Sequence, residues 1–147
     1  MEKNDLKFLI LFFYYNRPEM VLNAIKSLNK NTYKNFEIAF IDDGSNKPGE
    51  EVVRNELKPS FVKKTTFYNT NDTVEAKIER GGSEFGKIAN EAVKNSDADI
   101  VLMLCDDDAL FPDYLDKLNK FYRYNPKINY AYCKLKYYDP TKQRSEE

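Results

Sequence analysis

The stretch "KFLILFFYYNR", residues 7–17, decides how this chain is expected to fold. Its eight consecutive apolar or aromatic residues, Phe8 to Tyr15, are of strand length. The run shows no polar alternation, which is typical of a strand that is covered on both faces. "NRP" then ends the run, and the segment that begins at Pro18 places apolar residues at helical spacing. The stretch therefore predicts an interior strand followed by a helix.

The rest of the chain continues this alternation of strand and helix, about five times in all. Further strands are predicted at 36–41, 63–69, 98–105 and 128–138, and further helices at 49–57, 83–96 and 111–125. Residues 70–82 show no strong period and end in two glycines, which predicts a mobile loop. The order favours an α/β fold, a mostly parallel sheet with helices on both faces, in one domain of residues 1–147 with a polar tail at 139–147.

Two of these segments carry more detailed expectations. Residues 98–105, "ADIVLMLC", are predicted to form a buried strand. Ser83 is predicted to cap the amino end of the helix at 83–96. The buried face of that helix is predicted to consist of Phe85, Ile88, Ala89, Ala92 and Val93.

Composition and charge exclude several classes of protein. A chain of 147 residues with 41% hydrophobic and 32% charged residues is expected to be globular and soluble. A net charge of −1 argues against a nucleic-acid partner, and the lack of histidine excludes any mechanism with a histidine base. The first apolar run is far shorter than the about 20 residues of a membrane span. Cys105 and Cys133 lack metal-ligand spacing, so we expect a reduced core thiol at Cys105 and a cytoplasmic protein.

Polar clusters follow three of the predicted strands: "YYNR", "DDGS" and "DDD". In a parallel sheet such clusters meet at the carboxyl ends of the strands, where ligands bind. Asp106, Asp107 and Asp108 could cap the next helix, but three adjacent carboxylates behind a buried strand are costly unless a cation neutralises them. Hard divalent ions such as Mg²⁺ take carboxylates and substrate phosphates as ligands. These residues therefore favour a metal–phosphate site over a helix cap.

The other two clusters are less specific when each is taken alone. Asp42 and Asp43 precede Gly44 and could simply belong to a turn. Alternatively, one of them could accept a hydrogen bond from a nucleobase. Tyr15 and Arg17 suit an aromatic contact beside a base and a charge near phosphates. No "GxxxxGK[ST]" or "GxGxxG" is present, which argues against a P-loop and a dinucleotide site. Together the clusters suggest a nucleotide diphosphate site.

The combination resembles the nucleotide-sugar-binding part of a family 2 glycosyltransferase of the GT-A, Rossmann-like fold. The resemblance covers about residues 7–124 and rests on "YNR", "IDDGS", "GKIANEAVKNSDADIVLML" and "DDDALFP". It implies a DXD-type motif in the three aspartates. Measured back from Pro112, Cys105 stands at the family's usual first aspartate. The resemblance implies that Tyr15 lies beside the base and Arg17 near the nucleotide. It implies that Asp43 contacts the base, with Asp42 close by. It also implies that Asp106 contacts the ribose, that Asp107 is the metal ligand and that Asp108 is the alternative ligand. Many relatives have "ARN" where this chain has "IAN", so Lys87 or Arg80 would supply the cationic contact.

The resemblance also implies an activity. Such enzymes use a UDP-, dTDP- or GDP-sugar with Mg²⁺ or Mn²⁺ and transfer the sugar to a carbohydrate or lipid acceptor; a UDP-sugar and inversion are expected here. The family's acceptor half, with its carboxylate base, would follow the last predicted strand, so no catalytic base is assigned. We therefore expect a donor-binding half that works with a missing C-terminal segment, another chain or a second copy. Attachment to the inner membrane face and a non-catalytic nucleotide-sugar-binding module remain alternatives.

Overall fold

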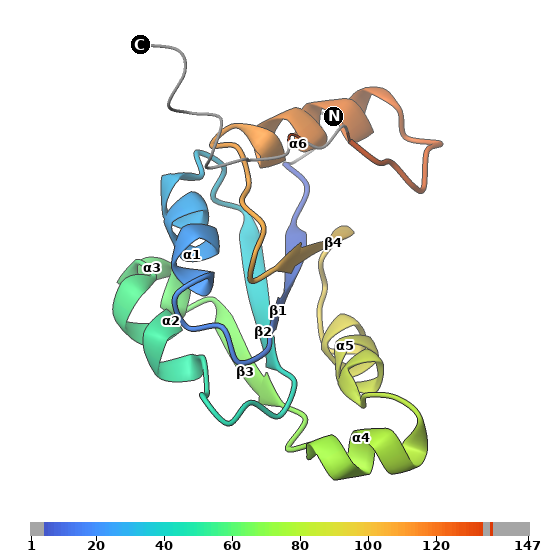
Figure 1. The fold of residues 1–147 in the computed structure, drawn as a ribbon. Helices are drawn as coiled ribbons and strands as arrows, with labels where there is room; N and C mark the ends of the chain where they lie inside the picture. Colours follow the sequence, from blue (N-terminus) through green and yellow to red (C-terminus); the bar gives the residue numbers. More distant parts are fainter. Residues whose placement is uncertain (1–4, 134–135, 137–147) are drawn as a thin grey trace.

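A computed structural model describes residues 5–133 and 136 of the chain. Its centre is a four-stranded sheet in the order β3-β2-β1-β4, and every neighbouring pair of strands is parallel (Figure 1). The strands are β1 (Phe8–Tyr14), β2 (Phe36–Asp42), β3 (Thr65–Asn69) and β4 (Ile100–Cys105). The predicted α/β class is confirmed, with the opening stretch as one of the two interior strands.

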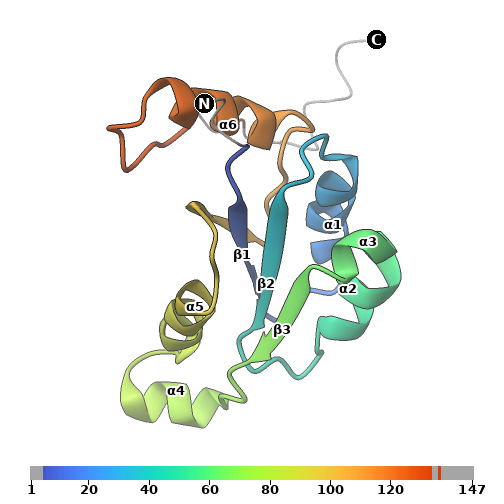
Figure 2. The ribbon, with the colours of Figure 1, turned by 180° about the vertical axis from the view of Figure 1, so that it is seen from behind.

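Helices cover both faces of the sheet, as predicted. α1 (Val21–Lys30), α2 (Glu50–Glu56) and α3 (Pro59–Val62) lie on one face, and α5 (Phe85–Lys94) lies on the other (Figures 1 and 2). α4 (Val74–Arg80) follows the carboxyl end of β3, and α6 (Tyr114–Tyr124) lies at the opposite end of the sheet (Figure 1). The parallel order therefore carries the chain after β1, β2 and β4 to the same end of the molecule.

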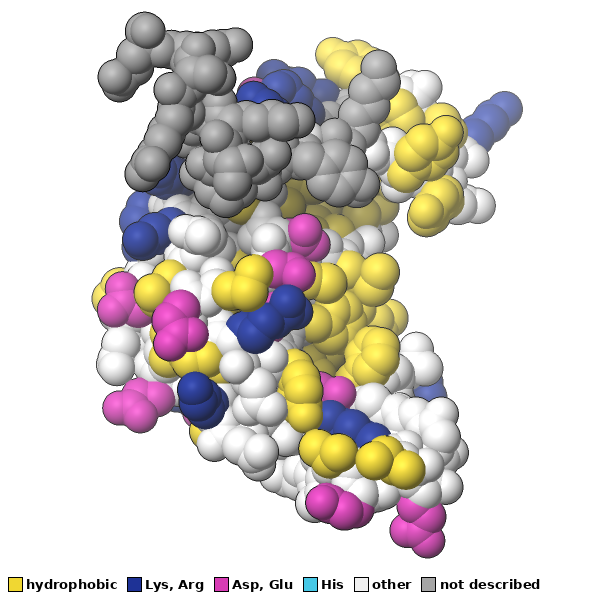
Figure 3. All heavy atoms as spheres, viewed as in Figure 1, with side chains coloured by type: hydrophobic (Ala, Val, Ile, Leu, Met, Phe, Trp, Pro, Cys, Tyr) yellow, Lys and Arg dark blue, Asp and Glu magenta, His cyan; other side chains and the backbone are white. Residues whose placement is uncertain are grey.

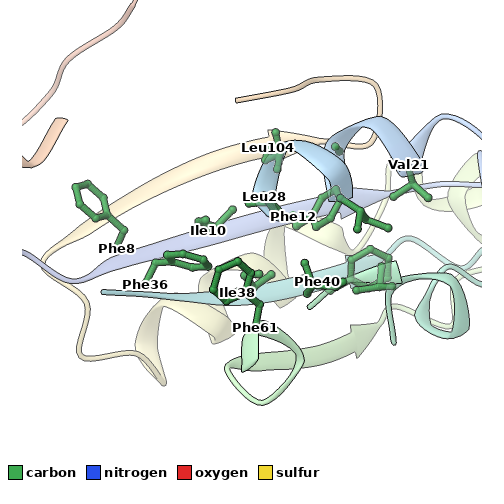
Figure 4. Packing of buried hydrophobic residues seen from close by; sticks show 14 of the residues in the cluster. Phe8, Ile10, Phe12, Val21, Leu28, Phe36, Ile38, Phe40, Phe61 and Leu104 are labelled. Carbon is green, nitrogen blue, oxygen red and sulfur yellow. The ribbon is translucent and has the colours of Figure 1, made fainter. Parts of the chain in front are cut away.

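Alternate residues of β1 serve two separate cores because successive strand side chains point to opposite faces. The larger core joins β1 and β2 to α1, with Phe12 and Phe40 in edge contact at 5.3 Å between ring centroids (Figure 4). The smaller core lies beneath α5 and includes Leu9, Leu11 and Ala92. Each fully buried large apolar side chain contributes about 1.5–3 kcal/mol. Burial on both faces explains why β1 is a continuous apolar run.

The prediction of a mobile loop at 70–82 is wrong, because residues 74–80 form helix α4. The side chain of Thr73 accepts a hydrogen bond from the Ala76 N–H at 3.1 Å, and Gly81 ends the helix with φ 78°. Both are ordinary helix-end signals. α4 buries none of its residues, and Ile78 is 76% exposed. The helix therefore lacks the apolar period that marks a helix packed on a core.

Other predicted boundaries and burials need smaller corrections. The helix expected from Pro18 begins at Val21, and Glu84 rather than Ser83 occupies the N-cap position of α5. In the predicted buried face of α5, Phe85 and Val93 are exposed. The strand expected at 128–138 is absent from its described residues, 128–133 and 136. The polar tail at 139–147 lies outside the described residues.

β4 is less buried than predicted, and it begins at Ile100 rather than at residue 98, although it ends at Cys105 as predicted. Within the described residues it pairs only with β1, and Val101 and Met103 are 41% and 71% exposed. Figure 3 shows apolar side chains gathered over this strand. None of the helices in residues 5–133 is long and apolar enough to cross a membrane.

Candidate functional site

The three polar clusters meet at one end of the sheet, which we call the carboxyl edge: the residues that directly follow β1, β2 and β4. Tyr14 is in register with Asp42, and Phe13 is in register with Cys105. The segments after β1 and β2 are also tied together, because the Asn16 N–H donates to Ser45 Oγ at 2.9 Å. The Lys47 N–H in turn donates to Asn16 Oδ1 at 3.0 Å. The expected convergence of the clusters is therefore present.

Asp106 is held at this edge by the segment after β1. Its residue is 1% exposed, and Arg17 Nη2 lies 2.5 Å from its Oδ1. Its Oδ2 accepts the Tyr15 N–H at 3.0 Å and Arg17 Nε at 3.3 Å. Charge-assisted, bidentate bonds of this kind are among the stronger polar contacts in proteins. They fix the buried carboxylate in place.

The next two aspartates are exposed and lie beside Cys105. One ligand atom from each of Cys105, Asp107 and Asp108 lies within 4.8 Å of the others, a spacing that could hold a metal ion. Arg17 Nη1 also donates to Asp107 Oδ2 at 3.0 Å. Burial and the neighbouring aspartates raise the pKa of the Cys105 thiol. A neutral thiol beside two carboxylates leaves the carboxylate oxygens as the donors that suit a hard divalent ion.

Asp43 lies at the centre of a second group of contacts, which we call the Asp43 cluster: Asp43, Lys77, Tyr15, Ser83 and Thr70. Lys77 Nζ lies 2.8 Å from Asp43 Oδ2 and 4.3 Å from the centroid of the Tyr15 ring. Asp43 Oδ1 accepts hydrogen bonds from Ser83 Oγ and, at 3.3 Å, from Thr70 Oγ1. The cluster combines an aromatic face with both charges and hydroxyl groups, which suits a planar polar ligand.

Tyr15 joins the two groups. Its backbone N–H bonds to Asp106, whereas its ring lies against Lys77, the partner of Asp43. Sequence reasoning placed Tyr15, Arg17, Asp43 and Asp106 together at this edge, and the structure brings them together. It missed Lys77 and Ser83 as members of the Asp43 cluster. The Thr73 cap and the Gly81 end signal could have revealed α4, but not the ion pair that Lys77 makes.

Asp42 differs from Asp43 in all of its contacts. It is buried, its Oδ1 accepts the Ser45 N–H at 2.9 Å, and its Oδ2 accepts the Gly49 N–H at 3.0 Å. Both carboxylate oxygens are thus used to close the turn after β2. These contacts favour a structural role for Asp42 over the ligand contact expected from the sequence.

Asp42→Asn is expected to destabilise the fold by about 1–3 kcal/mol, because an amide has one acceptor oxygen and leaves a buried backbone N–H unpaired. Urea unfolding followed by circular dichroism measures this loss. Nucleotide affinity, measured at a temperature where the variant is folded, should stay within about threefold of wild type, because both Asp42 oxygens bond to the turn and not to the ligand. A threefold change corresponds to less than about 1 kcal/mol of binding free energy. Unchanged stability together with lost nucleotide affinity would restore the ligand role for Asp42.

A second buried carboxylate, that of Asp72, joins parts of the segment from 70 to 84 to each other. Asp72 Oδ2 pairs with Arg80 Nη2 at 2.5 Å and accepts the Glu84 N–H at 3.2 Å. Its backbone also packs directly on Gly44, which has φ +71°. A Cβ at Gly44 would lie 2.1 Å from the Asp72 carbonyl oxygen. No role for Asp72 was predicted from the sequence. Its ion pair occupies Arg80, which was a candidate for a cationic contact with the nucleotide.

The structure does not bring Lys87 into either group of contacts. Its side chain is 78% exposed and its ammonium lies 3.2 Å from Glu84 Oε2. Its expected role in nucleotide binding stays a prediction. A concavity of about 430 Å³ lies at the opposite end of the sheet, lined in part by Lys7, Phe36 and Thr65. It is remote from the aspartates, and Lys7 there already pairs with Glu37 and Asp97.

The chain is similar to known proteins in sequence and in fold. The family model described as "Glycosyl transferase family 2" matches residues 10–146. An uncharacterized glycosyltransferase of Rickettsia conorii is 30% identical over 122 residues, which cover 83% of this chain and 18% of that protein. This chain spans between 18% and 35% of the length of four curated relatives that it matches.

Two solved structures share the fold. S. aureus TarS 1-349 in complex with UDP matches with a TM-score of 0.62 and 21% identity, over 81% of this chain and 32% of that one. The mannosyltransferase PcManGT from Pyrobaculum calidifontis, in complex with GDP-Man and Mn²⁺, matches with a TM-score of 0.55 and 16% identity, over 76% of this chain and 30% of that one. Both likenesses concern the fold of the chain.

Proposed function

This chain belongs to glycosyl transferase family 2, and on that premise we propose that its carboxyl edge binds a nucleotide-diphosphate sugar whose sugar is transferred to a carbohydrate or lipid acceptor. One observation carries the proposal: Tyr15 links the Asp43 cluster to Asp106, the first of the three adjacent aspartates. A base-sized polar cluster therefore adjoins a group of carboxylates suited to a metal diphosphate.

The Asp43 cluster is assigned to the nucleobase. Tyr15 offers a ring face, and Asp43 offers carboxylate oxygens that can accept a base N–H once Ser83 or Thr70 releases them. A UDP-sugar is the favoured donor because TarS was solved with UDP, whereas the GDP-Man complex of PcManGT keeps a GDP-sugar as the next candidate. Asp106 is assigned to the ribose, which lies between the base and the diphosphate in such a donor. Lys87 or Arg80 remains a candidate for a further cationic contact.

Asp107 is proposed as a ligand of Mg²⁺ or Mn²⁺, with Asp108 as the alternative or second ligand. Both are exposed, and their oxygens lie close enough together to share an ion. When bound, such an ion neutralises the charge that develops on the departing nucleotide diphosphate. The Mn²⁺ in the PcManGT complex supports a divalent ion in this fold, without identifying the ion that this chain would take.

The proposed transfer is a single displacement with inversion. The acceptor oxygen forms a bond to the anomeric carbon while the bond from that carbon to the diphosphate oxygen breaks on the opposite face. The acceptor proton passes to a carboxylate base, and we assign no residue of this chain to that role. A non-catalytic nucleotide-sugar-binding module would share the donor site and lack the transfer.

A thermal-shift screen of UDP-, dTDP- and GDP-sugars, each with and without Mn²⁺, tests the proposal. A ligand that binds only the folded chain stabilises it by about 2.7 kcal/mol at a hundred times its Kd. We expect a dose-dependent rise in melting temperature for one class of sugar nucleotide, larger with Mn²⁺ present. No shift with any sugar nucleotide would refute the donor site. Release of free sugar from the stabilising donor, or its transfer to an added acceptor, would exclude the non-catalytic module.

A further inference from the structure

Arg17 makes all of its described ion pairs with the carboxylates that the proposed function assigns to ribose and metal. Its Nη2 and Nε bond to the two oxygens of Asp106, and its Nη1 bonds to Asp107. One guanidinium thus spans two adjacent carboxylates. The Arg17 side chain is still 44% exposed, so it has room to leave.

The two carboxylates depend on Arg17 to different degrees. Asp106 is buried and also accepts the Tyr15 N–H, so it keeps a hydrogen bond when Arg17 is absent. Asp107 has a 42% exposed side chain, and Arg17 Nη1 is its only ion-pair partner among the described residues. Asp107 is therefore the carboxylate that a competing cation can take over.

A divalent ion at Asp107 and the guanidinium at the same oxygen would repel each other, because like charges at contact distance interact unfavourably even when screened. A nucleotide diphosphate removes this conflict. Its oxygens complete the coordination of the ion, and they match the planar fork of an arginine in two-point hydrogen bonds. Only the diphosphate offers the Arg17 guanidinium an anionic partner that can replace Asp107.

We propose that Arg17 occupies the metal-binding carboxylate in the donor-free chain and moves to the diphosphate on donor binding. Metal and nucleotide then bind tightly together, and each binds weakly alone. This inference rests on the proposed function and adds an order to it: the free chain resists the metal alone. Because linkage is reciprocal, the metal must then strengthen nucleotide binding by the same factor as the nucleotide strengthens metal binding. Arg17 is in this account a positioning residue.

The test is Mn²⁺ binding measured by electron paramagnetic resonance of the free ion, with and without UDP, for the wild type and for Arg17→Gln. In the wild type, UDP should tighten Mn²⁺ binding by a factor in the range of roughly 5- to 150-fold that is typical of coupled ligands. Arg17→Gln should bind Mn²⁺ alone more tightly than the wild type, and the factor gained from UDP should be smaller than in the wild type, because only the direct coordination of the ion by the diphosphate remains. Arg123→Gln is the matched control: it removes one guanidinium paired with Asp5 at the other end of the sheet and should leave both values unchanged.

Two outcomes separate this inference from the proposed function. If the wild type binds Mn²⁺ with UDP but Arg17→Gln binds Mn²⁺ alone no more tightly, Arg17 merely supports Asp106 and the inference is wrong while the donor site stands. If no variant binds Mn²⁺ with or without UDP, both fail. Arg17→Lys covers the case in which Arg17→Gln does not fold, since one ammonium keeps a charge beside Asp106 but cannot span both carboxylates. It should also bind Mn²⁺ alone more tightly than the wild type.

Discussion

Asp107→Asn is expected to remove metal-dependent nucleotide binding. Asp107 is exposed, lies beside Cys105 and Asp108, and makes its ion pair with Arg17, so its carboxylate carries little of the fold. Even the outer partners of metal ligands cost about 10–100-fold in metal affinity when they are mutated, and loss of a charged ligand should cost at least as much. Isothermal titration calorimetry with UDP, in the presence and absence of Mn²⁺, measures the effect.

The matched control for this change is Asp97→Asn, which makes the same neutral replacement beyond the amino end of β4. Asp97 is an exposed partner of Lys7 and should leave nucleotide affinity unchanged. Asp107→Asn should lower affinity only in the samples with Mn²⁺ and should leave the melting temperature of the free chain near that of the wild type. Wild-type affinity with Mn²⁺ present would move the metal assignment to Asp108.

Gly44→Ala is expected to give the largest loss of stability at the site. Gly44 has φ +71°, and an added Cβ would meet the backbone of Asp72 at 2.1 Å, a contact that only a shift of the backbone can relieve. The left-handed conformation costs a non-glycine residue about 1–2 kcal/mol, and overpacking typically adds about 1–3 kcal/mol. The shift would also move the segment that carries Lys77 and Ser83 away from Asp43, so nucleotide affinity should fall with stability.

Gly81→Ala separates the two causes. Gly81 has φ +78° but no atom within 4 Å of its added Cβ, so it should show only the conformational cost of about 1–2 kcal/mol. Urea unfolding of both variants gives the difference, which measures the contact with Asp72. Equal losses of unfolding free energy in the two variants would mean that the turn can shift at little cost. The close approach of Gly44 to Asp72 would then contribute nothing measurable to the stability of the site.

The two interior strands were predictable because they are buried on both faces, whereas the short helix α3 was not predicted although it buries Phe61. The runs at β1 and β2 face cores on both sides of the sheet, so their apolar character follows from their position. α4 was missed because none of its residues is buried, and without a buried face there is no apolar period to read. Its two ends were readable in Thr73 and Gly81, which shows that capping residues can mark a helix that hydrophobicity does not.

The candidate site was predictable only in outline. Parallel strands bring their carboxyl ends together, so the order of elements alone placed Tyr15, Asp43 and Asp106 at one edge. The order could not reveal Lys77, which meets Asp43 across 34 residues of chain. Nor could it show that Arg17 pairs with Asp106 and Asp107, since 89 and 90 residues separate the partners.

Asp42 and Asp43 show most clearly what the sequence determined and what the tertiary structure decided. The sequence by itself determined the α/β class, the strand-end position of both residues and the family to which their motif belongs, because these depend on local pattern and chain order. Only the tertiary structure decided that Asp42 closes a turn through two backbone N–H groups while Asp43 meets Lys77. The physical reason is that neighbouring side chains at a strand end point in opposite directions, so two identical adjacent residues enter different surroundings.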